Sequence, residues 1–238
     1  MEADVNFFEA ERLAAFEARR DTLAASFLRV IRTAHTGVIT HLDLNRDLAV
    51  AIHEYAPTAQ IVAGGQLWTS GGVYRLPGKE LISGWYAECR SCGAFARSKA
   101  ELDPFCSGCG APWTIRKWMI PSFGFMADKS PQKVGLAPPQ RMWSGGTYVV
   151  DDGQTLNETT VTSPTRSLTI QAARHATLMA VSEGPNNCGF LICDWCGRGL
   201  PVAAQGKKLA KHNHLWKSGD CTGPLQHTSL AHEFQPTS

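Results

Sequence analysis

"CRSCGAFARSKAELDPFCSGCG" (residues 89–110) holds four of the chain's eight cysteines in two C-x-x-C pairs. The pairs, Cys89 with Cys92 and Cys106 with Cys109, are separated by thirteen residues, and a glycine follows each. Zinc prefers four sulfur or nitrogen ligands in a tetrahedron, and two C-x-x-C turns at the end of a hairpin supply four sulfurs. The spacing therefore predicts a zinc ribbon. Because four thiolates leave no position for water, we expect this zinc to be structural and not catalytic.

A second cysteine block extends from Cys188 to Gly223. It contains a third C-x-x-C pair, again followed by glycine, and a further cysteine near its end. A histidine nitrogen commonly completes a site with three cysteines, and His212, His214 and Cys188 are all open as the fourth ligand. The ligands that we favour, with His214 as the alternate, are Cys193, Cys196, His212 and Cys221. The sequence thus predicts two bound Zn²⁺ ions.

The composition is that of a globular chain, with 238 residues, 43% of them hydrophobic and 18% charged. No apolar run approaches the roughly 18 residues of a membrane span, and the N-terminus is charged from its second residue. We therefore expect a cytoplasmic chain with reduced thiols and no membrane contact. Seven thiolates with two zinc ions would change the formal charge from +2 to −1, so any affinity for nucleic acid has to come from local patches.

Two helices are expected before the first cysteine block. Residues 6–33 have apolar side chains at helical spacing and neither Gly nor Pro, which predicts one long helix. That helix either packs on its own domain or docks on another polypeptide, and the sequence leaves both open. A shorter helix is expected from Asn45, as its N-cap, to Tyr55, just before Pro57.

Strands are expected over most of the remaining chain. Residues 60–75 predict a hairpin that turns at Gly64 and Gly65. Residues 131–146 are rich in Pro and Gly and predict a loop. Within 113–128 we expect a strand that Pro121 ends. Strands are also expected at 146–150 and over 166–184, the last as a bent pair.

Together these elements predict an α+β fold in which N-terminal helices precede a mostly antiparallel β core with two zinc sites. We expect a helical arm over residues 1–41 and a zinc-binding domain over residues 42–238. The two zinc sub-sites are expected within residues 85–112 and 188–223.

One segment of the second block is a candidate nucleic-acid surface. No acidic residue lies between Asp194 and Asp220, whereas basic and aromatic residues are frequent there. Lysines can pair with phosphates and an aromatic ring can stack on an unpaired base, although a solvated lysine face would have the same composition. The candidate binding residues are Arg198, Lys207, Lys208, Lys211, Trp216 and Lys217.

The chain lacks the motifs of common catalytic sites. The "PGKE" run at 77–80 has neither the upstream glycine nor the Ser/Thr of a phosphate-binding loop. Zinc deaminases require H-x-E and P-C-x-x-C, which the sequence does not contain. We therefore expect a protein that is not an enzyme.

Several motifs, taken in order, resemble one known family. They are "LNRDLAVAIHEYAP" (44–57), the first cysteine block, "IPSFGFMAD" (120–128), "GPNNCGFLICDWCGRGLP" (184–201), a following histidine, and "LAHEF" (230–234). This series is similar to the MrfA-type zinc-binding (MZB) domain of bacterial helicase-associated proteins, including the helicase-associated component of the DISARM phage-defence system. The resemblance covers roughly residues 42–236. The segment "FLRVIRTAHTGVITH" (27–41) departs from the family pattern.

The resemblance implies a zinc-stabilised, non-catalytic accessory module that partners a superfamily 2 helicase. Such a module would assist the engagement of DNA in anti-phage defence. The basic and aromatic residues named above extend this expectation to single-stranded DNA. The same two sets of cysteine and histidine residues would be its zinc ligands. The alternative function is a protein-interaction scaffold that makes no DNA contact and docks through its N-terminal helix.

Overall fold

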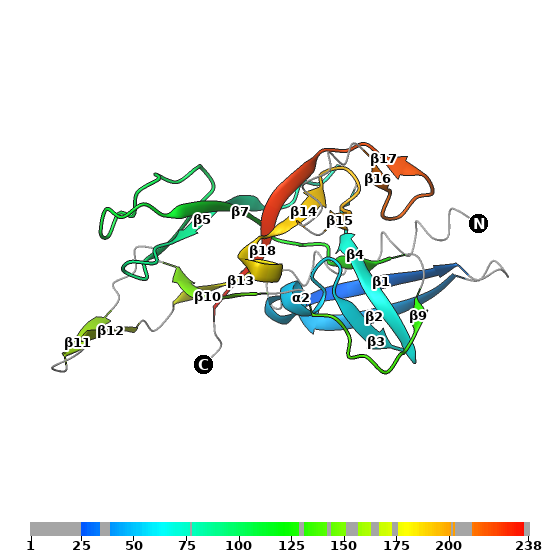
Figure 1. Cartoon of the computed structure of the whole chain (residues 1–238), viewed down its shortest axis with the longest axis horizontal. Coiled ribbons are helices and arrows are strands. Elements are labelled where there is room, and N and C mark those ends of the chain that lie inside the picture. Colours follow the sequence, from blue (N-terminus) through cyan, green and yellow to red (C-terminus); the bar gives the residue numbers. More distant parts are fainter. Residues whose placement is uncertain are drawn as a thin grey trace.

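The computed structural model describes residues 25–33, 39–76, 78–128, 131–141, 144–150, 157–162, 167–172, 176–200, 202 and 211–235. Over these residues the chain is β-rich. Two sheets of six and eight strands form the body of the molecule, and two short two-stranded pairs extend from it (Figure 1).

The six-stranded sheet has the order β2-β1-β8-β4-β3, with β9 also paired to β4. β1 runs antiparallel to β2 along its whole length and parallel to β8, a strand about a hundred residues later. The strands are β1 (Ala25–Thr33), β2 (Ile39–Asp47), β3 (Gln60–Ala63), β4 (Gln66–Val73), β8 (Phe125–Ala127) and β9 (Gln132–Lys133).

The eight-stranded sheet has the order β10-β13-β18-β7-β5-β6, and β14 and β15 extend it beside β18. It curls so far that its two outer strands, β6 and β10, face each other: the Phe95 ring stacks on Tyr148 with centroids 4.5 Å apart. The strands are β5 (Ser83–Glu88), β6 (Phe95–Ser98), β7 (Thr114–Met119), β10 (Gly145–Val150), β13 (Thr177–Ser182), β14 (Phe190–Cys193), β15 (Gly199–Leu200) and β18 (Leu225–Phe234).

The short pairs are β11 with β12 and β16 with β17. Their bounds are β11 (Asn157–Thr162), β12 (Ser167–Ala172), β16 (His212–Asn213) and β17 (Asp220–Cys221), and a 3₁₀ turn, η1, covers Pro185–Asn187.

A short helix, α2 (Leu48–Glu54), lies at the junction of the two sheets (Figure 1). It packs against β13 and β18 of one sheet and against β1 and β2 of the other. Its buried face consists of Leu48, Ala51 and Ile52, and these belong to the main hydrophobic core. Burial of apolar surface at about 25 cal/mol per Å² is the main force that holds such a junction together.

The predicted hairpin is confirmed. β3 and β4 pair antiparallel, and Gly64 and Gly65 between them have φ of 58° and 70°. A two-residue turn with two positive φ values matches the right-handed twist of the flanking strands, and glycine adopts it without a Cβ clash.

The predicted α+β class with N-terminal helices is wrong. Residues 25–33, expected at the end of a long helix, form β1, while residues 6–24 lie outside the described part of the chain. The expected boundary between a helical arm and the zinc-binding domain, after residue 41, falls inside β2. Strand β1 before it and strands β3, β4, β8 and β9 after it belong to one sheet. Val30, Ile31 and Thr33 are β-branched and favour a strand once a partner is present.

The N-cap of the short helix was also predicted wrongly. Asn45 lies in β2, and the cap is Asp47, whose side chain accepts a hydrogen bond from the Ala49 N–H at 2.8 Å. Pro57 follows the end of the helix, as expected. None of the helical segments in the described part of the chain has the length and hydropathy of a membrane span.

Candidate metal centres

The first cysteine cluster lies where β5, β6 and β7 meet. Cys89 follows β5, and its N–H donates to the Ala94 carbonyl at 2.8 Å while the Gly93 N–H donates back to the Cys89 carbonyl at 2.8 Å. The second turn repeats this pattern, with Cys106 and Gly110 in the places of Cys89 and Gly93. Both turns therefore have the same backbone shape, which aims two sulfurs at one point.

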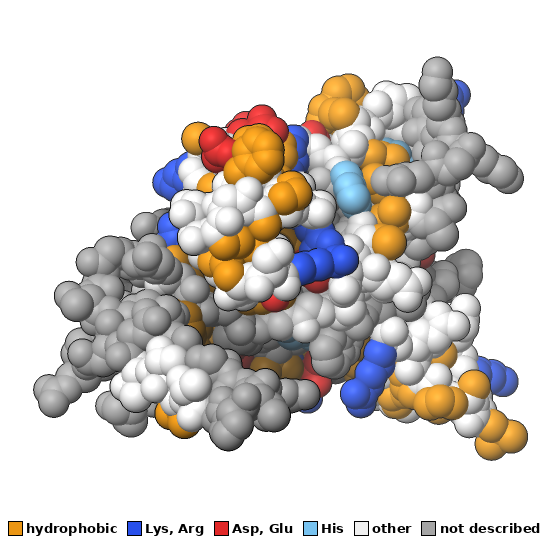
Figure 2. Space-filling model, turned by 60° about the vertical axis from the view of Figure 1, so that its left-hand side comes forward, with side chains coloured by type: hydrophobic (Ala, Val, Ile, Leu, Met, Phe, Trp, Pro, Cys, Tyr) orange, Lys and Arg blue, Asp and Glu red, His pale blue; other side chains and the backbone are white. Residues whose placement is uncertain are grey.

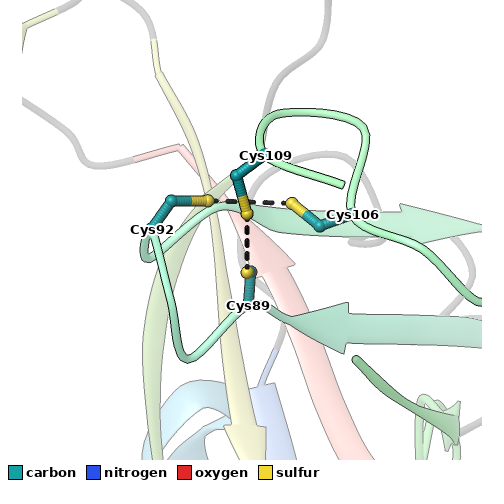
Figure 3. A group of neighbouring side chains, drawn as sticks. All are labelled: Cys89, Cys92, Cys106 and Cys109. Carbon is teal, nitrogen blue, oxygen red and sulfur yellow. Dashed lines mark hydrogen bonds between the residues drawn. The ribbon is translucent and has the colours of Figure 1, made fainter. Parts of the chain in front are cut away.

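The four sulfurs of Cys89, Cys92, Cys106 and Cys109 point toward one another (Figure 3). The Sγ atoms of Cys89 and Cys109 are 3.5 Å apart, and those of Cys92 and Cys106 are 3.7 Å apart. A tetrahedron with Zn–S bonds of about 2.3 Å has S–S edges of about 3.8 Å, whereas a disulfide has about 2.05 Å. The cluster therefore fits a four-coordinate metal ion.

The second cluster is assembled from three segments. Cys193 ends β14, Cys196 lies in the following turn, and the remaining two ligands sit on β16 and β17. The Sγ of Cys193 is 3.8 Å from that of Cys221, and the Sγ of Cys196 is 3.4 Å from Nε2 of His212. His212 and Cys221 are directly opposite in the β16–β17 register, which brings their side chains together.

The two clusters differ in their exposure. Cys92 and Cys109 of the first are exposed, whereas all four ligands of the second are buried. Within each cluster the four ligand atoms lie within 4.8 Å of one another. Both clusters could hold a metal ion by this geometry.

Thiol acidities in the metal-free chain are split within each cluster. Hydrogen bonding from the Cys92 N–H lowers the pKa of Cys89 to about 6. A hydrogen bond from the Cys193 thiol lowers the pKa of Cys196 to about 7, and the same bond together with burial raises the pKa of Cys193 to about 12. Neighbouring thiolates repel one another, so a bound cation is needed to ionise the whole set.

His214 and Cys188, the other candidates for the fourth ligand, lie outside both clusters. Nδ1 of His214 accepts the Lys217 N–H at 3.2 Å, and its ring packs edge-on against Trp216 with centroids 4.8 Å apart. The Cys188 thiol is exposed and donates to the Asn186 carbonyl at 3.5 Å.

The proposed nucleic-acid residues have different surroundings. Arg198 makes a two-point ion pair with Asp128, at 3.0 and 3.1 Å, and its side chain is only 13% exposed. Lys211 and Trp216 are exposed, and Lys217 Nζ lies 4.5 Å above the Trp216 ring centre. Lys207 and Lys208 lie outside the described residues. Figure 2 shows basic side chains scattered over one face and no continuous basic stripe among the residues coloured there.

Sequence reasoning missed two features. Trp195, inside the third C-x-x-C turn, is 64% exposed. Its position between two predicted metal ligands was the signal that could have identified it as a candidate functional residue. A buried network joins Tyr86, Arg116 and Glu183: the Tyr86 hydroxyl donates to Glu183 at 2.6 Å, and Arg116 contacts the same carboxylate. These residues are far apart in the sequence and no local pattern connects them.

Comparison with known proteins adds no relative: no family model, no curated protein and no solved structure matches this chain. The geometry of the two clusters is therefore the basis for any statement about function.

Proposed function

We propose that the chain is a zinc-stabilised, non-catalytic accessory module that binds two zinc ions. The observation that carries this proposal is that each cluster offers four protein ligands at the separations of a tetrahedral site. A set of four cysteines and a set of three cysteines with one histidine are both common for structural zinc. Zinc bound in this way would contribute roughly 10–16 kcal/mol of apparent binding free energy, comparable with the stability of a whole domain.

The completeness of the ligand sets supports a structural role. A catalytic zinc needs a position for water or substrate, and four protein ligands fill the tetrahedron. The second set is in addition wholly buried, so a substrate would have no approach to an ion held there.

The proposed role of the module is to help a superfamily 2 helicase engage DNA, in anti-phage defence. The helicase and the defence role come from the sequence resemblance alone. For DNA contact, the support is local: Lys211, Trp216 and Lys217 are exposed positions of the segment 211–217, which also contains the buried ligand His212.

Native mass spectrometry of the chain, purified without chelator, tests the metal proposal. We expect the apoprotein mass plus two zinc ions with seven thiol protons displaced. The Cys92→Ser variant should carry one zinc, and Cys188→Ser, which alters an exposed cysteine outside both clusters, should carry two. A visible thiolate-to-iron absorption band, or a metal-free mass, would contradict the proposal.

DNA engagement is tested separately by titrating the zinc-loaded chain with labelled single-stranded and duplex DNA at several salt concentrations. We expect binding that weakens as salt rises, because phosphate contacts release counterions. Addition of the chain should also stimulate the DNA-dependent ATPase of its helicase partner. Absence of DNA binding at low salt would remove the DNA role while leaving the metal proposal intact.

A further inference from the structure

Two tryptophans project from the second metal centre into solvent. Trp195 is 64% exposed and Trp216 is 37% exposed, whereas Trp68 and Trp118 of the core are each 3% exposed. Leaving large apolar rings in water forfeits their burial energy. Two exposed indoles on one small centre therefore indicate a surface that binds something.

The metal cluster itself fixes the positions of these rings. Trp195 directly precedes the buried ligand Cys196. Leu215 is buried among the ligand cysteines, and Trp216 follows it directly. The two tryptophans are thus the chain neighbours of two buried residues, Cys196 and Leu215, that belong to one cluster.

Trp195 is also held by close packing on a glycine. A Cβ at Gly223 would lie 2.8 Å from Cγ of Trp195 and 2.7 Å from Sγ of Cys193. The absence of that Cβ lets the indole lie on the backbone beside the metal ligand. The Trp216 ring packs nearly perpendicular to the His214 ring, with centroids 4.8 Å apart.

The charges around the rings favour an anionic polymer. Lys217 Nζ lies 4.5 Å over the Trp216 ring, and Lys211 is exposed close by in the chain. The charge of Asp194, beside Trp195, is offset by Arg75 at 3.7 Å, and its carboxylate also accepts a hydrogen bond from Gln226 at 2.7 Å. Within residues 211–223 only Asp220 is acidic.

We propose that Trp195, Trp216, Lys211 and Lys217 form a binding surface for single-stranded nucleic acid, in which the indoles stack on bases and the lysines pair with phosphates. Unpaired bases expose the π-faces that such rings require, whereas a duplex hides them. This inference rests on the proposed DNA role and narrows it to a strand type and a set of residues that the second metal centre positions.

The test is fluorescence anisotropy with a labelled oligothymidylate and a duplex of equal length, using the full zinc-loaded chain. Trp195→Ala and Trp216→Ala should each weaken binding of the single strand about tenfold, within the range of stacking contributions. Trp216→Phe keeps a stacking ring and should retain most of the affinity. Phe105→Ala is the matched control, because Phe105 is a 56% exposed aromatic residue beside ligand Cys106 of the other centre.

Lys211→Ala with Lys217→Ala should reduce the slope of log K against log salt by about 1.4, since each single-strand phosphate contact contributes about 0.7. All variants are to be compared at two zinc ions per chain. If the unaltered chain binds no nucleic acid, the proposed DNA role fails. If the unaltered chain binds and both tryptophan variants bind the single strand as tightly as it does, the DNA role stands and this surface is overturned. The same holds if Phe105→Ala loses as much affinity as the tryptophan variants.

Discussion

His212 and His214 are two residues apart, but their surroundings give them different roles. His212 is buried, with Nε2 3.4 Å from Sγ of Cys196. His214 accepts backbone N–H groups of the turn that follows it, from Trp216 at 3.4 Å and from Lys217 at 3.2 Å. One ring completes a ligand set, and the other stabilises a turn.

His212→Ala should therefore weaken the second zinc, while His214→Ala should keep both ions. Loss of an outer contact to a metal ligand already reduces affinity about 10–100-fold, so loss of the ligand itself should cost at least as much. Zinc stoichiometry by native mass spectrometry, with competition by a chromophoric chelator, measures both variants. The assignment of the fourth ligand is refuted if His214→Ala releases the ion and His212→Ala does not.

Tyr86 is the centre of the buried polar network between β5, β13 and β18. Its hydroxyl donates to Glu183 at 2.6 Å and lies 2.9 Å from the Ser229 hydroxyl. Glu183 is only 4% exposed, so few water molecules can replace a lost partner. Burial and the Glu183 carboxylate together raise the pKa of Tyr86, which keeps the hydroxyl protonated as a donor.

Tyr86→Phe should lower the free energy of unfolding by about 1–3 kcal/mol, because it leaves buried groups with one partner fewer. Tyr148→Phe is the control: the Tyr148 hydroxyl donates to Glu88 at an exposed position, 3.2 Å away, and its loss should cost less than about 1 kcal/mol. Urea denaturation with zinc in excess gives both values. Equal losses of unfolding free energy in the two variants would show that burial of the Tyr86 network adds nothing to stability.

At the scale of the element, the three C-x-x-C-G turns share one backbone shape but not one environment. Gly93, Gly110 and Gly197 have φ of 75°, 72° and 74°. A Cβ at Gly93 or Gly110 would meet nothing within 4 Å, whereas a Cβ at Gly197 would lie 1.9 Å from the Val73 carbonyl oxygen. The third turn is thus packed directly against β4.

Gly93→Ala should cost only the left-handed backbone strain, about 1–2 kcal/mol. Gly197→Ala should cost at least about 2 kcal/mol more, because the added methyl also displaces the Val73 N–H from the Gly197 carbonyl, now 2.9 Å away. The urea midpoints of the two zinc-loaded variants, compared with that of the unaltered chain, measure both destabilisations. Equal destabilisation would mean that the turn is not clamped on β4.

Local patterns in the sequence were sufficient for the turns and the hairpin. The C-x-x-C-G spacing predicts the cysteine pairs, and Gly64 with Gly65 predicts the β3–β4 turn, since each depends on a few adjacent residues. β1 was predicted wrongly because Phe27 and Ile31 also fit a helical period. Its strand conformation depends on pairing with β2 and with Phe125 and Met126 of β8. A local stretch of sequence around β1 does not include these β8 partners, so its pattern could not reveal the pairing.

The sequence was sufficient to predict the cysteine ligands of the second cluster, but it left more than one histidine open. Cys193 and Cys196 are fixed by a turn, but His212 is selected by its place opposite Cys221 in a pairing of two-residue strands. Trp195 and the Tyr86 network were missed because exposure and long-range burial depend on the tertiary fold.

At the scale of the whole molecule, the two centres occupy different places in the architecture. The first is built on β5, β6 and β7, which all belong to the eight-stranded sheet. The second begins at the end of β14 in that sheet, and its turn bonds to Val73 of β4 in the other sheet. The ion pair of Arg198 with Asp128 adds a second contact across the same junction.

Zinc should therefore leave the chain in two phases when a chromophoric chelator is added in excess. The fast phase belongs to the first centre, where Cys92 and Cys109 are exposed, and the slow phase to the second, whose ligands are all buried. Release from the buried site requires local opening of the junction, so intrinsic tryptophan fluorescence should change with the slow phase. Cys92→Ser should lack the fast phase, and Cys188→Ser should keep both. A single phase in the unaltered chain, or a fluorescence change that accompanies the fast phase only, would mean that the second centre does not join the two sheets.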